Sequence, residues 1–130
     1  MSFLSRPALA LTAAMIGVAA LLGGSLGIVA AAHNQSLVQG FNLVGGPLGA
    51  DTAPGHYISC VPTSAWTAIY IWDAQNQKWQ HYFNTDDAPT YINNPDAGGI
   101  QTIKRLAGVV VLTTQAVPDA TFLDRPSDQC

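Results

Sequence analysis

The chain has 130 residues and a formal net charge of −3 at neutral pH, which leaves room for one domain. Beyond residue 32 there are four basic and eight acidic residues, all of the latter Asp, so this part carries a net charge of −4. A mildly acidic chain without a basic patch argues against nucleic acid and against anionic lipid headgroups as partners.

The first predicted element is an N-terminal hydrophobic helix. Residues 7–32, PALALTAAMIGVAALLGGSLGIVAAA, carry no charge, and Arg6 is the only charged residue before His33. Ala30 and Ala32 form an A-x-A cleavage pattern, which favours a secretory signal peptide. The stretch also exceeds the roughly 20 residues that span a bilayer, so an uncleaved membrane anchor is the alternative. Residues 1–32 are therefore assigned as signal peptide or anchor, and residues 33–130 as one exported module, extracellular or at the cell surface.

The module opens with a predicted strand over GFNLVGGP, residues 40–47, in which Phe41 and Leu43 are apolar and the Gly-Pro turn ends the strand. The next segment, TAPGHYISC, leaves room for one short helical turn between prolines. We expect no longer helix in the module, because strong helix formers are scarce there.

The clearest prediction is an antiparallel hairpin from residue 66 to residue 83, WTAIYIWD-AQNQ-KWQHYF. Alternation with a period of two puts Ile69 and Ile71 on one face of the first strand. The opposite face holds Trp66, Ala68, Tyr70 and Trp72. Both faces are apolar, which indicates a central strand covered on both sides. In the second strand, Trp79, His81 and Phe83 share one face, and Lys78, Gln80 and Tyr82 share the other.

Residues 84–99 read as a loop in which Tyr91 and Ile92 are expected to be the buried apolar residues. Ile100 and Ile103 are expected to point inward from a short strand or turn. VVVLTT, residues 109–114, is β-branched and uninterrupted, which indicates another central strand. The tail is predicted to be extended, with Phe122 and Leu123 docked on the module.

These elements predict an all-β fold: a small antiparallel sandwich or partly closed barrel of four to six strands, preceded by the N-terminal hydrophobic helix. Cys60 and Cys130 are the only cysteines. In an exported chain an even pair predicts a disulfide, here Cys60–Cys130. Closing a loop of about 70 residues contributes roughly 4 kcal/mol in the chain-entropy model.

The sequence provides no catalytic or metal motif. His33, His56 and His81 lie at no metal-ligand spacing, and the two distant cysteines lack the pairing of a zinc site. A Ser-His-Asp set can be drawn from His56 with Ser59 or Ser64, but no G-x-S-x-G elbow accompanies it. We therefore predict no enzyme activity, no metal site and no cofactor.

The spacing of these segments resembles a β module of bacterial exported and cell-surface proteins. The likeness runs from Gly40 to Thr114 and rests on a G-[FW]-N-L-V opening, a W-D-x5-W-x2-Y hairpin, the segment PTYINN and a glycine-led closing strand. Such modules often end in G-x-G-Y-W, whereas this chain has AGVVVL and lacks the final aromatic residue. The resemblance implies an exported β module and no particular activity.

Four residues occupy the hairpin positions of that module and are the candidate ligand-binding set: Trp72, Asp73, Trp79 and Tyr82. Exposed aromatic rings beside polar side chains can stack on the apolar face of a sugar and pair with its hydroxyl groups. Core filling is the competing explanation and accounts for most of the rings, since cross-strand aromatic pairs also stabilise hairpins.

The predicted function is a non-enzymatic structural or binding role, with recognition of a cell-envelope glycan or a surface protein through the hairpin aromatics. The alternative is an accessory subunit of a membrane complex. Its uncleaved N-terminal helix would pack on partner helices through small residues, namely Gly17, Gly23, Gly24 and Gly27. Contact with a membrane is expected only through residues 1–32.

Overall fold

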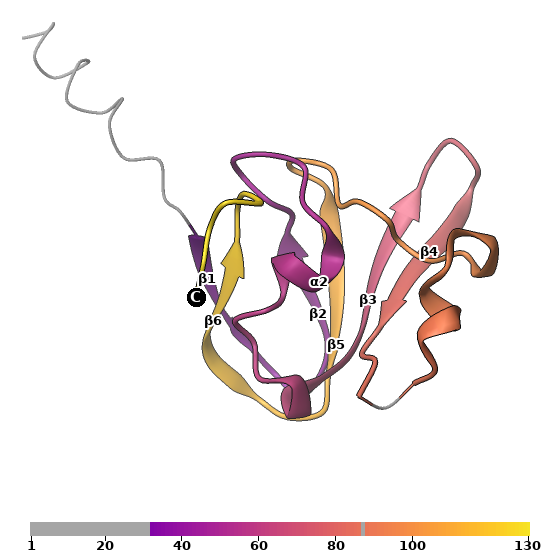
Figure 1. Cartoon of the computed structure of the whole chain (residues 1–130). Helices are drawn as coiled ribbons and strands as arrows, with labels where there is room; N and C mark the ends of the chain where they lie inside the picture. Colours follow the sequence, from indigo (N-terminus) through magenta and orange to yellow (C-terminus); the bar gives the residue numbers. More distant parts are fainter. Residues whose placement is uncertain (1–31, 87) are drawn as a thin grey trace, which may run out of the picture.

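The computed structural model describes residues 32–86 and 88–130 (Figure 1). This part of the chain is built mainly from six strands: β1 (Ala32–Leu37), β2 (Gly40–Gly45), β3 (Trp66–Asp73), β4 (Lys78–Phe83), β5 (Gly108–Thr113) and β6 (Val117–Leu123). The helical elements are short: α2 (Pro54–Tyr57), η1 (Thr63–Ala65), η2 (Thr90–Asn93) and η3 (Pro95–Ala97). The predicted N-terminal hydrophobic helix lies outside the described residues.

The strands form two antiparallel sheets. One has the order β2-β5-β3-β4, and the other pairs β1 with β6. The all-β prediction is confirmed at this level, with six strands in the described ranges. These strands do not close into a barrel, because β2 and β4 are the edges of an open sheet.

The hairpin of β3 and β4 has the bounds that the sequence predicts, because its cause is local. The turn residue Asp73 accepts hydrogen bonds from the backbone N–H groups of Gln75 and Asn76, both at 3.1 Å. Such bonds are the usual reason for Asp at the start of a turn. The register that follows pairs Trp72 with Trp79.

Trp66 departs from the predicted alternation. Trp66 pairs with Thr113 and Ala68 pairs with Leu112, so β3 advances by two residues while β5 advances by one. This is a β-bulge. A bulge turns the following side chains to the other face. The indole of Trp66 is therefore buried in the core, with its ring centroid 6.3 Å from that of Tyr82, and does not share a face with Tyr70 and Trp72.

The prediction that β5 is central is confirmed, since it lies between β2 and β3 and Val109 and Val111 are fully buried. The strand β3 is also internal, with Ala68 and Ile69 buried. These two residues point to opposite faces, so both faces are buried at this level of the strand. Further along, Tyr70 is half-buried and Trp72 is 46 % exposed. The prediction that both faces of β3 are covered is therefore wrong for the end of the strand at Trp72, which is part of the site described below.

The sequence reading missed the pairing of β1 with β6. In β1, AHNQSL is mostly polar, and Ala32 falls within the assigned leader. Strand β6 contains Pro118 and has Asp119 at a positive φ of 54°, so its sequence indicated only an extended tail. Docking of Phe122 and Leu123 is confirmed, because both are buried.

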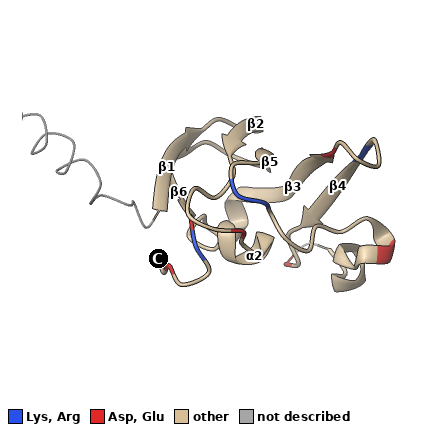
Figure 2. Cartoon of the chain, turned by 90° about the horizontal axis from the view of Figure 1, so that it is seen from above, with Lys and Arg blue, Asp and Glu red and all other residues tan. Residues whose placement is uncertain are grey.

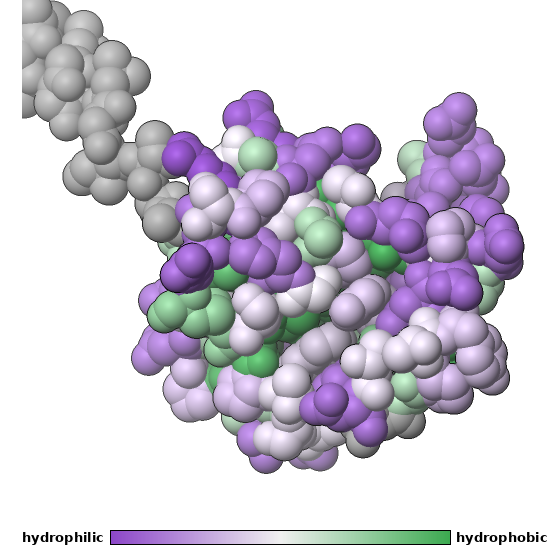
Figure 3. Space-filling model, viewed as in Figure 1, coloured by the Kyte–Doolittle hydropathy of each residue, from purple (hydrophilic) through white to green (hydrophobic). Residues whose placement is uncertain are grey.

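The core lies between the two sheets and under α2, which crosses in front of β2 and β5 (Figure 1). Tyr57 of α2 is fully buried, stacks on Phe122 with 5.0 Å between ring centroids, and donates a hydrogen bond to the carbonyl of Gly45. Ile100 and Ile103 are buried as predicted. Tyr91 is not, since it is 69 % exposed, and the prediction that it is buried is wrong. On the side that carries α2, hydrophilic residues lie mostly around the rim of the surface, with pale and hydrophobic patches between them (Figure 3).

The predicted disulfide is present. Cys60 and Cys130 are bonded, with 5.4 Å between their Cα atoms. The bond ties the C-terminus to the segment after α2 across a sequence separation of 70 residues. Such a bond is consistent with an extracellular location.

Candidate functional site

One face of the four-stranded sheet carries a group of exposed aromatic and aliphatic side chains, and we call it the outer face. Paired residues of neighbouring strands point to the same side, so the register defines its members. One row runs across the sheet through Phe41, Leu112, Ala68 and Phe83. The next row is Leu43, Val110, Tyr70 and His81, and the Trp72–Trp79 pair lies beyond it.

The two tryptophans of the predicted set lie together on this face. Their ring centroids are 5.3 Å apart with the planes inclined by 65°, an edge-to-face arrangement. Trp72 is 46 % exposed and Trp79 is 56 % exposed. On β5 the next residue that faces the same side after Leu112 and Val110 is Gly108. A Cβ added at Gly108 would meet no atom within 4 Å. The Trp pair is therefore open to ligands at the end of the sheet.

A shallow hollow of about 480 Å³ lies beside the Trp pair, lined by Phe41, Tyr70, Trp79 and Val110. On β2, Phe41 and Leu43 stand beside it at 70 % and 73 % exposed. Sequence reasoning did not assign these residues to the site. The alternation of Phe41 and Leu43 in GFNLV was visible in the sequence, but that β2 lies beside β5 was not.

The carboxylate of Asp73 is committed to the turn. Besides the two backbone N–H groups, its oxygens accept hydrogen bonds from the side-chain amide of Asn76 at 2.7 Å and, weakly, from that of Gln80 at 3.5 Å. Hydrogen bonds from Asn76 hold the pKa of Asp73 below its usual value. Asp73 thus shapes the hairpin and has little acceptor capacity left for a ligand.

Tyr82 lies away from the Trp pair. It pairs with Ile69 on the opposite side of the sheet, where its ring stacks on Trp66 with the planes inclined by 18°. Its hydroxyl lies so close to Gly55 that a Cβ there would come within 2.7 Å of it. Of the four predicted site residues, the fold brings together Trp72 and Trp79, puts Asp73 next to them in the turn, and leaves Tyr82 beside the core.

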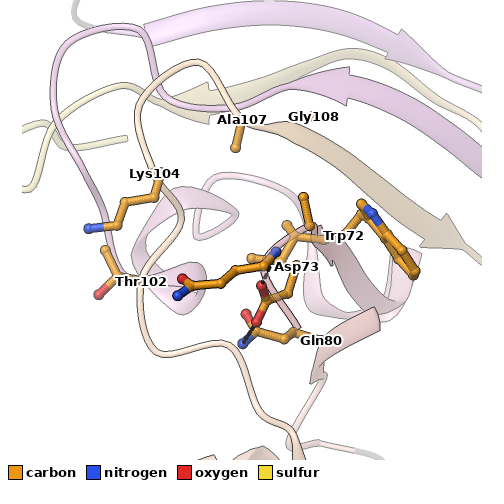
Figure 4. A pocket seen from close by; sticks show the side chains of 10 residues that line it. Trp72, Asp73, Gln80, Thr102, Lys104, Ala107 and Gly108 are labelled. Atoms are coloured by element: carbon orange, nitrogen blue, oxygen red, sulfur yellow. Dashed lines mark hydrogen bonds between the residues drawn. The ribbon is translucent and has the colours of Figure 1, made fainter. Parts of the chain in front are cut away.

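A second cavity of about 620 Å³ opens between the tip of the hairpin and the loop before β5 (Figure 4). Lys104 and Thr102 lie on one side of it and Asp73 and Gln80 on the other, with Trp72 at the rim. We call it the hairpin cleft. Gln75 also lines it. The residues from the loop could not be found from sequence, since nothing local indicates that residues 102–108 fold beside the hairpin.

Within the described ranges, the side chains of Thr102 and Gln75 take part in no hydrogen bond. Lys104 donates to Asp51 at 2.9 Å and keeps two further N–H groups for other acceptors. The hairpin cleft thus offers donors and acceptors, with Trp72 at its rim and the indole ring directed away from it (Figure 4).

His56, Ser59 and His81 are engaged in hydrogen bonds elsewhere. The Nε2 of His56 lies 3.1 Å from the carbonyl of Arg125, and the Ser59 hydroxyl donates to the backbone carbonyl of His56. The Nε2 of His81 lies 2.8 Å from the carbonyl of Ile92. No cluster of three or more potential metal ligands occurs in the described part of the chain.

Among residues 32–86 and 88–130, none of the helices has the length and apolar character needed to cross a bilayer.

No protein-family model matches the chain, and no match was found among curated proteins or solved structures. The resemblance to the bacterial exported module therefore remains a prediction.

Proposed function

We propose that this protein is a non-enzymatic exported module that binds a saccharide of the cell envelope at the end of its β3–β4 hairpin. The observation that supports this most directly is the Trp72–Trp79 pair. Two indole rings in contact, each about half exposed, are held in place by the cross-strand register rather than by a ligand. Binding to such a preformed surface costs little ordering entropy.

The chemistry of a sugar fits the two parts of this region. One face of a pyranose ring is lined with C–H groups and stacks on an exposed indole, while the hydroxyl groups need hydrogen-bonding partners. The Trp pair offers the first kind of contact. The amides of Gln75 and Gln80, the hydroxyl of Thr102 and the ammonium of Lys104 offer the second, in the hairpin cleft next to Trp72. Asp73 would act as a positioning residue for the turn.

The arrangement of ionisable groups supports a binding role rather than catalysis. Hydrolysis of a glycosidic bond usually needs two carboxyl groups of different acidity facing each other across the substrate. In the hairpin cleft the lining residues include one carboxyl group, Asp73, and the turn amides occupy it.

Export is supported by the disulfide and by the sequence of residues 1–32. Sequencing the N-terminus of protein purified from its host would separate the two forms of this proposal. A chain that begins at His33 is a released or surface-bound module and excludes the membrane-subunit alternative. A chain that retains residues 1–32 is an anchored one.

Glycan binding is tested by screening the protein on an array of envelope saccharides and measuring the affinity of any hit. Replacing Trp72 by Ala should weaken binding about tenfold or more, since loss of one stacking contact of about 1.4 kcal/mol gives that factor. The matched control is Tyr91→Ala, which removes a ring that is 69 % exposed from η2 and that belongs neither to the Trp pair nor to the lining of the hairpin cleft.

Both variants should unfold at temperatures close to that of the parent, because both rings are largely outside the core. The proposal fails if the parent binds no saccharide, or if a folded Trp72→Ala variant binds as tightly as the control.

A further inference from the structure

We propose that two copies of this chain pack outer face against outer face, forming a two-fold symmetric dimer. The proposal rests on the sheet face itself and not on glycan binding. An antiparallel sheet in a small protein usually buries one apolar face and presents a polar one to water. Here the buried face is the one covered by α2, yet the opposite face is apolar too.

The outer face lacks the features of a solvated surface. None of its members is Lys, Arg or Asp, and apart from Asp119 within β6 the charged residues of the described chain lie in loops and at strand ends (Figure 2). Its polar groups are the imidazole of His81, which already contacts the carbonyl of Ile92, and the phenol hydroxyl of Tyr70. A second copy could therefore cover this face without leaving an unpaired charge buried, which is the main cost of closing an interface.

The shape of the outer face is complementary to itself. Phe41 and Leu43 form an exposed ridge on the edge strand β2, and Phe41 is also one wall of the hollow whose other lining residues are Tyr70, Trp79 and Val110. Consider a two-fold axis that runs parallel to the strands, midway between the two sheets and above the line between β5 and β3. It brings β2 of each copy over β4 of the other, so that each ridge meets the aromatic rings of the opposite sheet. Sheets packed in this way lie about 10 Å apart.

The area is sufficient for a dimer. With full side-chain areas of about 150–250 Å² for aromatic residues, the exposed fractions of Phe41, Leu43, Trp72 and Trp79 leave roughly 500 Å² uncovered on each copy. The half-buried Tyr70, Val110 and Leu112 add to this. Two such faces bury in total about 1,200 Å², the lower end of the range for stable interfaces.

The edges of the sheet favour packing through the face rather than strand-to-strand pairing. On β4, the backbone N–H of His81 donates to the carbonyl of Gly98 at 3.1 Å, and that of Phe83 donates to the side chain of Asn93 at 2.7 Å. On β2, the carbonyl of Leu43 accepts from the side chain of Gln35 at 3.1 Å. Side chains and loops thus occupy both edges, which is how sheets avoid edge-to-edge association.

A second copy fits the outer face better than the other occupants. A saccharide needs polar partners, and the β2 half of this face has none among its side chains. The uncharged segment before β1 is a further candidate, but as a signal peptide it would be absent from the released protein. The dimer requires only the described module.

Sedimentation velocity of the protein as its host releases it, between about 1 and 100 μM, tests the dimer. The parent should sediment as a dimer at the upper concentrations. Leu43→Asp should be monomeric or dissociate at least 100-fold more readily, because each interface would bury two unpaired carboxylates. Leu43→Lys is the second variant and should also be monomeric or dissociate at least 100-fold more readily than the parent. Leu106→Asp is the matched control, since it adds the same charge at a leucine that is 63 % exposed in the loop before β5.

A monomeric parent throughout this range would overturn the proposal, and so would a Leu43→Asp variant that stays dimeric. The two-fold packing also covers the Trp pair, so a saccharide and a second copy compete for it, and the glycan proposal is judged separately on the monomeric Leu43→Asp background. Leu43→Asp should bind the saccharide at least as tightly as the parent, and the double variant Leu43→Asp, Trp72→Ala should lose that binding. A double variant that binds as tightly as Leu43→Asp would contradict the glycan proposal and leave the dimer proposal standing.

Discussion

The imidazole of His33 donates a hydrogen bond to the buried carboxylate of Asp124, with 2.7 Å between Nδ1 and Oδ1. The same carboxylate oxygen accepts the backbone N–H of Leu48 at 2.8 Å. Asp124 is fully buried, and its backbone carbonyl accepts two further N–H groups from residues 49 and 50. One carboxyl group therefore joins the start of β1, the end of β6 and the loop after β2.

This pair should be strongly coupled in folding stability. A double-mutant cycle of His33→Ala and Asp124→Asn, followed by urea unfolding, should give a coupling free energy of about 1.5–3 kcal/mol, since hydrogen bonds to buried charged groups contribute in that range. The matched control is the Lys104–Asp51 pair, whose side chains are exposed and whose coupling should be much smaller. Equal couplings in the two cycles would contradict the assignment.

The bond between Tyr57 and the carbonyl of Gly45 predicts a loss of stability in alkali. Burial, with a smaller contribution from the charge of Asp124, raises the pKa of the Tyr57 phenol above its ordinary value of about 10. Below pH 10 the phenol is protonated in both states, so its full contribution is present. Above that pH the unfolded chain ionises first, and stability falls by at most about 1.4 kcal/mol per pH unit.

Urea unfolding at several pH values between 8 and 11 checks this. Tyr57→Phe should be less stable than the parent at pH 8 and should lose less stability as the pH rises, because the titrating group is gone. Tyr91→Phe removes an exposed phenol and should keep the slope of the parent. If the free energy of unfolding falls equally steeply with pH in Tyr57→Phe and in the parent, the buried phenol is not the source of the alkaline loss of stability.

The elements with local causes could be predicted from sequence. The bounds of the β3–β4 hairpin follow from alternation and from the turn chemistry at Asp73, and the central place of β5 follows from its run of valines. Alternation also puts Tyr82 on the side opposite to Trp79. The bulge at Trp66 has no such signal, because it depends on the register with β5.

The exposure of the Trp pair could not be predicted either. Whether an aromatic ring on a strand is core or surface depends on whether another layer covers that face, which is a property of the whole fold. Buried Trp66 and exposed Trp72 lie six residues apart in the same strand. Likewise, the hairpin cleft depends on a loop that is some 20 residues away along the chain from β4.

Residues 93–99 lie along the free edge of β4, and Gly99 permits the close backbone approach that this position requires. The side chain of Asn93 bonds both the N–H and the carbonyl of Phe83, at 2.7 and 2.8 Å, in the manner of a neighbouring strand. A Cβ added to Gly99 would overlap the backbone carbonyl of Asn93. Gly99→Ala should therefore displace this segment and lower the free energy of unfolding by about 1–3 kcal/mol.

Amide hydrogen exchange provides the local measurement. In Gly99→Ala the N–H groups of His81 and Phe83 should exchange faster, because their partners Gly98 and Asn93 move away. Gly108→Ala is the matched control, since a Cβ there meets no atom within 4 Å, and it should leave both stability and exchange near those of the parent. Unchanged protection of Phe83 in Gly99→Ala would show that Asn93 closes the edge without needing the close approach of Gly99.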